Sequence, residues 1–513
     1  MTVPLNSDKT LTAPPAGLKE WGPVEQFPGL SVRFLKEARS LPIRRKDDGI
    51  LLAMADPSDQ ETVMALEVAL GAPVTPVSAP EAEILETIEA IYQPGSPMSR
   101  LVGDMDTEVV EEAQEESAEI GHLRDKAREA PIIQLVNFIL LRAVEMGASD
   151  IHLEPFENIF RVRYRRDGIL YEAESPPKGL QAAVISRLKI MARMDIAERR
   201  LPQDGRFGLK VKGQEIDARV STIPTFWGES MVIRILDRER VILDLNRLGF
   251  PLPIFNRFDR MIHKPHGMIL VTGPTGSGKT TTLYAALERI NSPEKKIITI
   301  EDPVEYRLPG INQVQVKPTI GLTFARGLRH LVRQDPDIIL VGEIRDQETA
   351  EIAIHAALTG HLVFSTLHTN DAAGAITRML EMGTEDYLLA SAVIGILAQR
   401  LVRLICPHCK TALPVDAGLE QLLLDNSGQQ PECLYMGQGC PNCAHTGYQG
   451  RTGIYELLEV TEPIRQLILQ QSDAATLYQA AKQQGMQTLS GDGWTKVAAG
   501  LTTSQEVLRV TQE

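Results

Sequence analysis

The sequence predicts an α/β protein of several domains, the largest of which is a parallel sheet with helices on both faces. With 513 residues the chain is too long for one hydrophobic core, so roughly three or four domains are expected. Apolar runs of strand length alternate with helical stretches in the second half of the chain, which is typical of a wound parallel sheet. These runs span residues 268–272, 297–300, 338–341 and 362–365.

The first hundred residues predict a small α/β domain, with a strand over residues 50–54 and a helix over residues 81–92. Between residues 104 and 119 there are eight acidic residues and no basic residue, which indicates either a solvated linker or an exposed acidic helix. A solvated linker and an exposed acidic helix would each mark a domain boundary here. We therefore expect an N-terminal domain at residues 1–100 and an acidic linker at residues 101–126.

A second α+β domain is expected at residues 127–245. Polar side chains interrupt the apolar stretch 132–148, which therefore predicts a buried amphipathic helix rather than a membrane span. Alternating residues on both sides of Asp167 and Gly168 predict a β-hairpin. A proline-rich stretch then separates this domain from a third one at residues 246–400, which contains the four apolar runs.

A glycine-rich loop follows the first apolar run. Residues 273–280 match the pattern G-x-x-x-x-G-K-[ST] in full, directly after a predicted strand and before a predicted helix. The glycines let successive backbone N–H groups face a phosphate, and the helix start adds the positive end of its dipole. Lys279 is then expected to reach the β- and γ-phosphates of ATP, while the Thr280 hydroxyl holds Mg²⁺. The predicted nucleotide-binding residues are Gly273, Pro274, Thr275, Gly276, Ser277, Gly278, Lys279, Thr280 and Thr281.

A carboxylate follows the third apolar run. Glu343 comes at the carboxyl end of a predicted parallel strand, where ligands gather, so it can polarise a water that attacks the γ-phosphate. We therefore predict that Glu343 and Lys279 are catalytic, although a single buried glutamate at a strand end can also be purely structural. Asp337 lies at the opposite end of the same strand and is predicted to be a turn residue.

Polar residues also follow the second and the fourth run. Glu301 and Asp302 would be repelled by phosphate unless magnesium and its water shell lay between them, so both are predicted to be outer-sphere magnesium residues. His368 is predicted to sense the γ-phosphate. The pattern around His361 fits a core histidine and a functional histidine equally well.

Four of the five cysteines form two C-x-x-C pairs, separated by 30 residues. This spacing predicts a tetrahedral four-thiolate Zn²⁺ site in a module at residues 401–450. Four thiolates leave no open coordination position, so the zinc is predicted to be structural rather than catalytic. The predicted ligands are Cys406, Cys409, Cys440 and Cys443, and Cys433 lies outside the pattern.

The net charge of −14 argues against a protein built to coat nucleic acid, and the segment between the cysteine pairs is acidic as well. The sequence has no run of about 18 apolar residues, so direct membrane insertion is not expected. The N-terminus lacks the basic and apolar regions of an export signal, which favours a cytoplasmic location.

The four nucleotide-site segments, in this order, resemble the Walker A, Asp box, Walker B and His box of the secretion ATPase superfamily. Residues 148–155, 200–206 and 218–224 look like the domain that precedes the motor in that superfamily. Residues 440–456 and 500–511 are most similar to the GspE group of type II secretion ATPases. The resemblance extends from the second domain to the end of the chain, and the first hundred residues match more loosely.

This resemblance implies a RecA-like P-loop motor domain, a zinc-ribbon-like insertion and a C-terminal helical region at residues 451–513. It also implies a cytoplasmic homo-hexamer that hydrolyses ATP to drive pseudopilus assembly and the export of folded proteins by type II secretion. In the superfamily, ATP lies between the motor and the preceding domain, whose arginines close on the γ-phosphate. By motif position these are Arg206, Arg219 and Arg234, although single surface arginines are often merely solvated.

The partners that the resemblance implies lie at the inner membrane. The N-terminal domain would dock on the cytoplasmic domain of a GspL-like protein, and the zinc module would face a GspF-like platform protein. A type IV pilus assembly ATPase is the alternative, but residues 1–100 lack the repeated Arg-Leu-Gly-type motif of relatives that bind a cyclic dinucleotide. A nucleic-acid translocase and a scaffold with a degenerate motor are further alternatives, and the intact Lys279, Thr280 and Glu343 argue against the scaffold.

Overall fold

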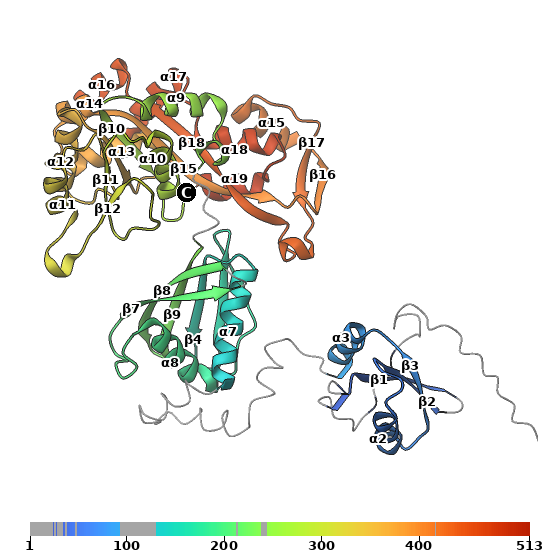
Figure 1. Ribbon diagram of the computed structural model, residues 1–513. Helices are drawn as coiled ribbons and strands as arrows, with labels where there is room; N and C mark the ends of the chain where they lie inside the picture. The colour runs from blue at the N-terminus through green and yellow to red at the C-terminus, as the bar shows by residue number, and fades with distance from the viewer. Residues whose placement is uncertain are drawn as a thin grey trace, which may run out of the picture.

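The computed structural model of the chain describes residues 24, 27, 34–35, 38–46, 49–92, 130–211, 214–237, 244–415 and 417–512. These residues form an N-terminal α/β domain, a second α+β domain and a large α/β motor domain (Figure 1). The fold class predicted from the sequence is thereby confirmed. The predicted acidic linker at residues 101–126 lies outside the described residues.

The N-terminal domain is a three-stranded sheet with two helices. β1 (Ser40–Lys46) pairs antiparallel with β2 (Gly49–Met54), and β2 pairs parallel with β3 (Val74–Ser78). The helices α2 (Gln60–Leu70) and α3 (Glu81–Tyr92) bury apolar side chains in the same core as these strands. The predicted strand and helix of this domain are therefore confirmed.

The second domain is a six-stranded antiparallel sheet whose two helices, α7 (Ala130–Glu145) and α8 (Gln181–Ala192), share one apolar core with the strands. Asp167 and Gly168 have φ angles of 49° and 87°, the left-handed values that a two-residue hairpin turn requires, so the predicted hairpin is confirmed. In spatial order the strands are β6 (Ile169–Glu172), β5 (Phe160–Arg166), β4 (Asp150–Pro155), β9 (Gly228–Asp237), β8 (Gln214–Thr225) and β7 (Gln203–Val211).

The motor domain has a seven-stranded sheet in which only the last strand is antiparallel. The four apolar runs predicted to be parallel strands all lie in this sheet. In spatial order the strands are β12 (Asn312–Gln315), β11 (Ile297–Glu301), β13 (Ile338–Val341), β14 (Leu362–Leu367), β10 (Gly267–Thr272), β15 (Val393–Ile405) and β18 (Tyr448–Glu459).

Helices cover this sheet on both faces, as predicted. One buried cluster joins the sheet to α11 (Phe324–Leu331), α12 (Gln347–Leu358), α13 (Ala372–Glu381) and α14 (Asp386–Ala392). A separate cluster joins it to α9 (Leu252–Ile262) and α10 (Lys279–Ile290). The carboxyl ends of the parallel strands therefore form one edge of the sheet, where a ligand can reach several strands at once.

The four cysteines lie between two neighbouring strands of the motor sheet, β15 and β18. The segment that joins these strands contains β16 (Lys410–Pro414), α15 (Ala417–Ser427) and β17 (Cys433–Gly437), with β16 and β17 paired antiparallel. The cysteine module is therefore an insertion in the motor domain, on the right-hand side in Figure 1. After β18 come α16 (Glu462–Leu469), α17 (Ala474–Gln483), α18 (Leu489–Ala498) and α19 (Ser504–Thr511).

The second domain contacts the base of this insertion. The Gly450 N–H donates to Asp167 Oδ2 (3.3 Å), and Arg451 lies 3.5 Å from Asp167 Oδ1. Arg403 donates to the hydroxyl of Tyr171 (3.1 Å). The predicted hairpin therefore carries the turn that docks on the motor domain.

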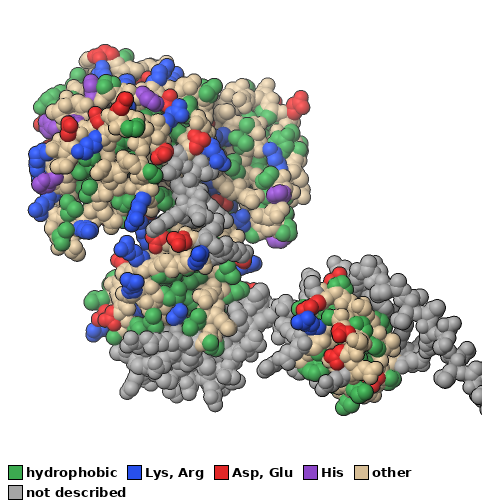
Figure 2. Space-filling view, viewed as in Figure 1, with side chains coloured by type: hydrophobic (Ala, Val, Ile, Leu, Met, Phe, Trp, Pro, Cys, Tyr) green, Lys and Arg blue, Asp and Glu red, His purple; other side chains and the backbone are tan. Residues whose placement is uncertain are grey.

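The surface of the motor domain is mixed in charge. Figure 2 shows Lys and Arg side chains interspersed with Asp and Glu on its visible face. Across the described ranges, no helix combines the length and apolarity that crossing a bilayer demands.

Candidate nucleotide site

The glycine-rich loop has the backbone shape that phosphate binding requires. It joins the end of β10 to the start of α10, and Gly273, Gly276 and Gly278 have φ angles of 146°, 81° and 89°. A Cβ on Gly273 would lie 2.4 Å from the carbonyl oxygen of Gln399, so no other residue fits there. The first N–H groups of α10 point out of the helix beside this loop, as an anion site needs.

The side chains of the loop also fit a phosphate. Lys279 Nζ donates to the carbonyls of Gly273 (2.7 Å) and Pro274 (3.1 Å), and burial lowers the pKa of Lys279 to about 8. A phosphate beside Nζ would favour the charged ammonium again. Ser277 Oγ is buried and has no hydrogen-bond partner within the described part of the chain, so it can donate to a phosphate oxygen.

Gln399, which was not predicted from the sequence, holds the glycine-rich loop in place. Gln399 is buried in β15, where its Nε2 donates to the carbonyl of Ser277 (2.8 Å) and its Oε1 accepts from the hydroxyl of Thr282 (2.7 Å). The loop and the first turn of α10 are thus tied to a strand more than one hundred residues away. A single amide inside an apolar strand is the signal that could have identified it.

Glu343 lies where the sequence predicted it, directly after β13. One carboxylate oxygen is 2.6 Å from Arg345 Nη2, and the other is 3.4 Å from His368 Nε2. Arg345 was not predicted, although it is only two residues along the chain from Glu343. Glu343 is therefore placed to accept a proton from a water at this edge of the sheet.

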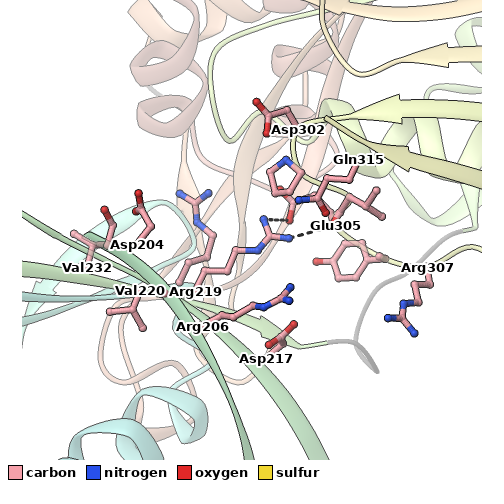
Figure 3. A pocket seen from close by; sticks show the side chains of 16 residues that line it. Asp204, Arg206, Asp217, Arg219, Val220, Val232, Asp302, Glu305, Arg307 and Gln315 are labelled. Carbon is pink, nitrogen blue, oxygen red and sulfur yellow. Dashed lines mark hydrogen bonds and ion pairs between the residues drawn. The ribbon is translucent and has the colours of Figure 1, made fainter. Parts of the chain in front are cut away.

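The two predicted magnesium residues differ in their surroundings. Glu301 is buried and accepts hydrogen bonds from Thr299 Oγ1 (2.5 Å), from Gln313 Nε2 (3.3 Å) and from the Tyr284 hydroxyl. Asp302 is exposed and lines both cavities between the two domains, and Figure 3 shows its carboxylate turned away from the arginines. Asp302 is therefore the one of the two whose oxygens are open to a hydrated cation.

The three predicted arginines form a row across the second domain. Arg206 pairs with Arg219 between β7 and β8, and Arg219 pairs with Arg234 between β8 and β9, so all three share one face of the sheet. Arg219 donates to the Val304 carbonyl (3.0 Å) and lies 3.1 Å from Glu305, both in the motor domain (Figure 3).

Arg234 is held differently, by Asp150 within its own domain (3.1 Å). Arg206 is exposed and lines the outer part of the cleft, a cavity of about 950 Å³ that also reaches Arg219 and Arg234. The row therefore extends from the outer cavity toward the glycine-rich loop.

The inner part of the cleft, a cavity of about 610 Å³, brings most of the predicted residues together. It contains residues from both domains, and only Arg206 of the three arginines is missing from its walls. Its predicted residues are Arg219, Arg234, Thr275, Gly276, Ser277, Gly278, Lys279, Thr280, Thr281, Glu301, Asp302, Glu343 and His368, and Arg345 and Arg451 join them.

Two other polar residues of the sheet have structural partners. His361 Nδ1 lies 2.8 Å from the Ala356 carbonyl, at the end of α12, which favours the core reading of this histidine. Asp337 Oδ2 accepts from the Lys296 N–H (2.6 Å) at the amino end of β13, the end of the strand opposite to Glu343.

The four predicted zinc ligands converge. The sulfur pairs Cys406–Cys440 and Cys409–Cys443 are each 3.9 Å apart, Cys440–Cys443 is 3.7 Å, and all four sulfurs lie within 4.8 Å of one another. A tetrahedral site with Zn–S bonds of about 2.3 Å needs sulfurs about 3.8 Å apart, so the geometry fits zinc. Backbone N–H groups of Gly439, Cys440 and Gly447 point at these sulfurs, as anionic thiolates require.

Comparison with known proteins gives consistent matches along the chain. Residues 125–509 match the family model described as type II/IV secretion system protein, and residues 16–98 match the MshEN domain. The chain is 50% identical over 496 residues to the type II secretion system protein E of Xanthomonas campestris pv. campestris, which covers 96% of this chain and 87% of that protein.

Two further matches are to named ATPases or motors. The chain is 47% identical over 475 residues to the type IV pilus assembly ATPase PilB of Myxococcus xanthus, covering 91% of this chain and 83% of that protein. The crystal structure of the pilus retraction motor PilT with bound ADP superimposes with a TM-score of 0.50 and 28% identity, covering 74% of this chain and 97% of that one.

Proposed function

This chain belongs to the type II/IV secretion system protein family, and we propose that it hydrolyses ATP to drive pseudopilus assembly and the export of folded proteins through a type II secretion system. It is an ATP-hydrolysing enzyme, as its family and its similarity to secretion and pilus ATPases indicate. One observation carries the proposal: the glycine-rich loop, Glu343 and arginines of the preceding domain line a single cleft.

Each wall of the cleft has a distinct task in hydrolysis. The bound Mg–ATP supplies the phosphoanhydride bond that is broken. Backbone N–H groups of the loop would hold the phosphates, Lys279 would neutralise the β- and γ-oxygens, and the Thr280 hydroxyl would hold the magnesium ion. Glu343 orients the attacking water and accepts its proton, while Asp302 and Glu301 would help to hold a hydrated magnesium ion.

The arginine row couples hydrolysis to domain movement. In this structure Arg219 is bound to Val304 and Glu305, in the loop that follows Asp302. A γ-phosphate competes with the Glu305 carboxylate for the same guanidinium, so nucleotide binding exchanges this ion pair for a phosphate contact. Arg234 and Arg206 extend the same wall, and His368 reads the state of the γ-phosphate through Glu343.

Glu343→Gln tests the enzymatic part of the proposal, because it removes the proton acceptor and keeps the shape of the side chain. We expect the kcat for ATP hydrolysis to fall at least about 100-fold. ATP should still bind, as equilibrium binding of a fluorescent ATP analogue in the presence of magnesium would show. Wild-type hydrolysis that persists in this variant would exclude Glu343 as the base.

A homo-hexamer is the proposed working assembly. The second domain exposes apolar side chains at the end of its sheet opposite the Asp167 turn, with Phe226 90% and Ile223 51% exposed. Trp227 packs edge-on against Phe226, and Lys178 links Trp227 to the neighbouring turn at Glu157. A neighbouring copy that covers this tip would support the ring, and Phe226→Ser should shift the protein toward monomers in light scattering.

The proposed setting is the cytoplasmic side of the inner membrane, reached through partners. The N-terminal domain is proposed to bind the cytoplasmic domain of a GspL-like protein, and the cysteine module a GspF-like platform protein. The mixed charge of the motor surface gives no support for a nucleic-acid partner. Pull-down of purified chain by the isolated GspL-like cytoplasmic domain, with and without residues 1–100, tests the first contact.

Type IV pilus assembly is the second candidate, because the similarity to PilB spans 91% of this chain. The two candidates differ in the machine that they drive rather than in the chemistry. Expression of this chain in strains that lack either the secretion ATPase or the pilus ATPase separates them. Restored export of a secreted enzyme supports the first candidate, and restored surface pili support the second.

We propose that the cysteine cluster holds a structural Zn²⁺, which would fix the ends of the insertion near the motor sheet. Metal analysis of the purified protein should give one zinc per chain. Cys406→Ser should release the zinc and lower the thermal unfolding temperature. Cys433→Ser is the control, and it should keep both the zinc and the unfolding temperature of the wild type.

A further inference from the structure

A buried carboxylate that takes no part in the proposed chemistry joins two distant helices. Glu456 lies on β18 and is 1% exposed. Its Oε1 accepts from the N–H of Ala372 (3.0 Å), and its Oε2 accepts from the N–H of Leu489 (3.3 Å). These donors are the first residues of α13 and of α18. One side chain therefore closes the N-termini of two helices that lie more than one hundred residues apart.

Elementary electrostatics explains why a charge is placed here. Each helix start has unpaired N–H groups and the positive end of a dipole, so a carboxylate between two of them is attracted by both. Burial acts in the opposite direction and, together with the nearby Asp371, raises the pKa of Glu456 to about 7. The two hydrogen bonds to Glu456 therefore stabilise both helix starts, and the loss of either one would leave a buried polar group without its partner.

The α13 end of this contact is connected to the nucleotide site. Thr272, the residue before the glycine-rich loop, accepts from the Thr369 N–H (2.9 Å) and bonds the Thr369 hydroxyl (2.7 Å). Thr369 in turn donates to the carbonyl of Asp371, the N-cap of α13 (3.0 Å). His368, which faces Glu343, is four residues before Ala372. The first turn of α13 therefore sits at the end of the loop that senses the γ-phosphate.

The α18 end is connected to the cysteine module. The Ser490 hydroxyl, one residue after Leu489, donates to Asn426 Oδ1 (3.1 Å) in α15, which lies between the two cysteine pairs. A cavity of about 430 Å³ beside Glu456 is lined by Asn370, Asp371 and Leu489, so there is space for the two helix starts to change position. A route of hydrogen bonds, joined by the peptide bonds Asp371–Ala372 and Leu489–Ser490, thus leads from Thr272 to Asn426.

We propose that Glu456 is a positioning residue that transmits the nucleotide state from the His368 loop to α18, and through α18 to the cysteine module. The inference rests on the proposed ATPase function, because it needs a nucleotide that acts on His368. A merely structural cap would stabilise both helices but would not carry a nucleotide-dependent change from one to the other.

Hydrogen exchange of the full-length chain tests the proposal, with and without magnesium and a non-hydrolysable ATP analogue. In the wild type we expect slower exchange on nucleotide binding in peptides that cover residues 366–376 and also in those that cover residues 486–494. In Glu456→Gln the first response should remain and the second should shrink at least threefold. The kcat for hydrolysis should fall about tenfold, with less than a twofold change in KM.

Two variants make the result specific. Glu459→Gln removes a carboxylate from the same strand without touching either helix start, and it should behave as the wild type. Glu456→Asp keeps the charge but shortens the side chain, so it should restore part of the α18 response. If Glu456→Gln does not fold, Glu456→Asp alone should show a response of α18 that is weaker than in the wild type.

Several outcomes would overturn the proposal. One is an α18 response that survives in Glu456→Gln, since Glu456 would then be only a cap. Another is a wild-type response that stops at residues 366–376 while hydrolysis proceeds normally, which leaves the proposed function intact. A wild type that neither binds nor hydrolyses the nucleotide would instead remove the proposed function, and this inference with it.

Discussion

The two walls of the nucleotide cleft are built in different ways. The phosphate-binding part of the motor-domain wall is a loop of consecutive residues, shaped by its own glycines between β10 and α10. The opposite wall is a row of arginines contributed by three strands of the second domain, so each arginine is placed by strand register. A shift of one residue in that register would turn the arginines to the other face of the sheet. The glycine-rich loop is a local property of the chain, and the arginine row is a property of the fold.

The largest effect is expected from a substitution that deforms the glycine-rich loop. Gly273→Ala places a Cβ 2.4 Å from the Gln399 carbonyl at a φ of 146°, so the loop must deform. We expect ATP affinity to fall at least about 100-fold, because the phosphate-binding N–H groups move with the loop. Gly276→Ala, at a φ of 81° with no atom within 4 Å, should cost about tenfold or less. Equal losses in the two variants, measured by equilibrium ATP binding, would contradict this account of the loop.

Arg219→Ala tests the row of arginines on the opposite wall of the cleft. We expect kcat to fall about 1,000-fold with ATP affinity changed less than tenfold, since a guanidinium that closes on the γ-phosphate acts mainly on the transition state. Steady-state kinetics measures both quantities. Arg161→Ala is the matched control, because Arg161 lies on the same domain but pairs with Glu172, away from the cleft. A large loss of ATP affinity with kcat preserved would place Arg219 in ground-state binding instead.

A smaller loss of activity should show that the glycine-rich loop also depends on a residue that is distant in the sequence. Gln399→Leu removes the hydrogen bonds that Gln399 makes with the Ser277 carbonyl and the Thr282 hydroxyl, so the loop should shift without unfolding. We expect kcat/KM to fall about tenfold, because small displacements of a phosphate site are costly. Gln466→Leu, on the exposed surface of α16, is the control. No change in kcat/KM would mean that the loop holds its shape without β15.

The smallest effect is expected at the contact that places the second domain. Asp167→Asn weakens the contacts of the hairpin turn with Arg451 and Gly450, which are partly open to solvent. We expect kcat to fall about two- to threefold at low salt. The difference from the wild type should disappear at about 1 M salt, where surface ion pairs are screened. A salt-independent loss of hydrolysis would indicate that Asp167 acts through something other than this ion pair.

The sequence predicted those parts of the site in which neighbouring residues act together. The glycine-rich loop, Glu343 after its strand and the two cysteine pairs were all identified from short patterns, and the structure brings each group to one place. Gln399 and the contact of Arg451 with Asp167 were not predicted. Their partners lie more than one hundred residues away, and a lone amide or arginine carries no local pattern.

The sequence by itself determined the wound parallel sheet, the phosphate loop and the four-sulfur cluster, because hydrophobic periodicity and residue spacing act over a few residues. Tertiary structure alone decided which arginines share a face, that Glu301 is buried while Asp302 faces the cleft, and that Glu456 joins α13 to α18. These arrangements depend on strand register and on the packing of distant segments. Many contacts across the whole domain determine them together, so no short stretch of the sequence predicts them.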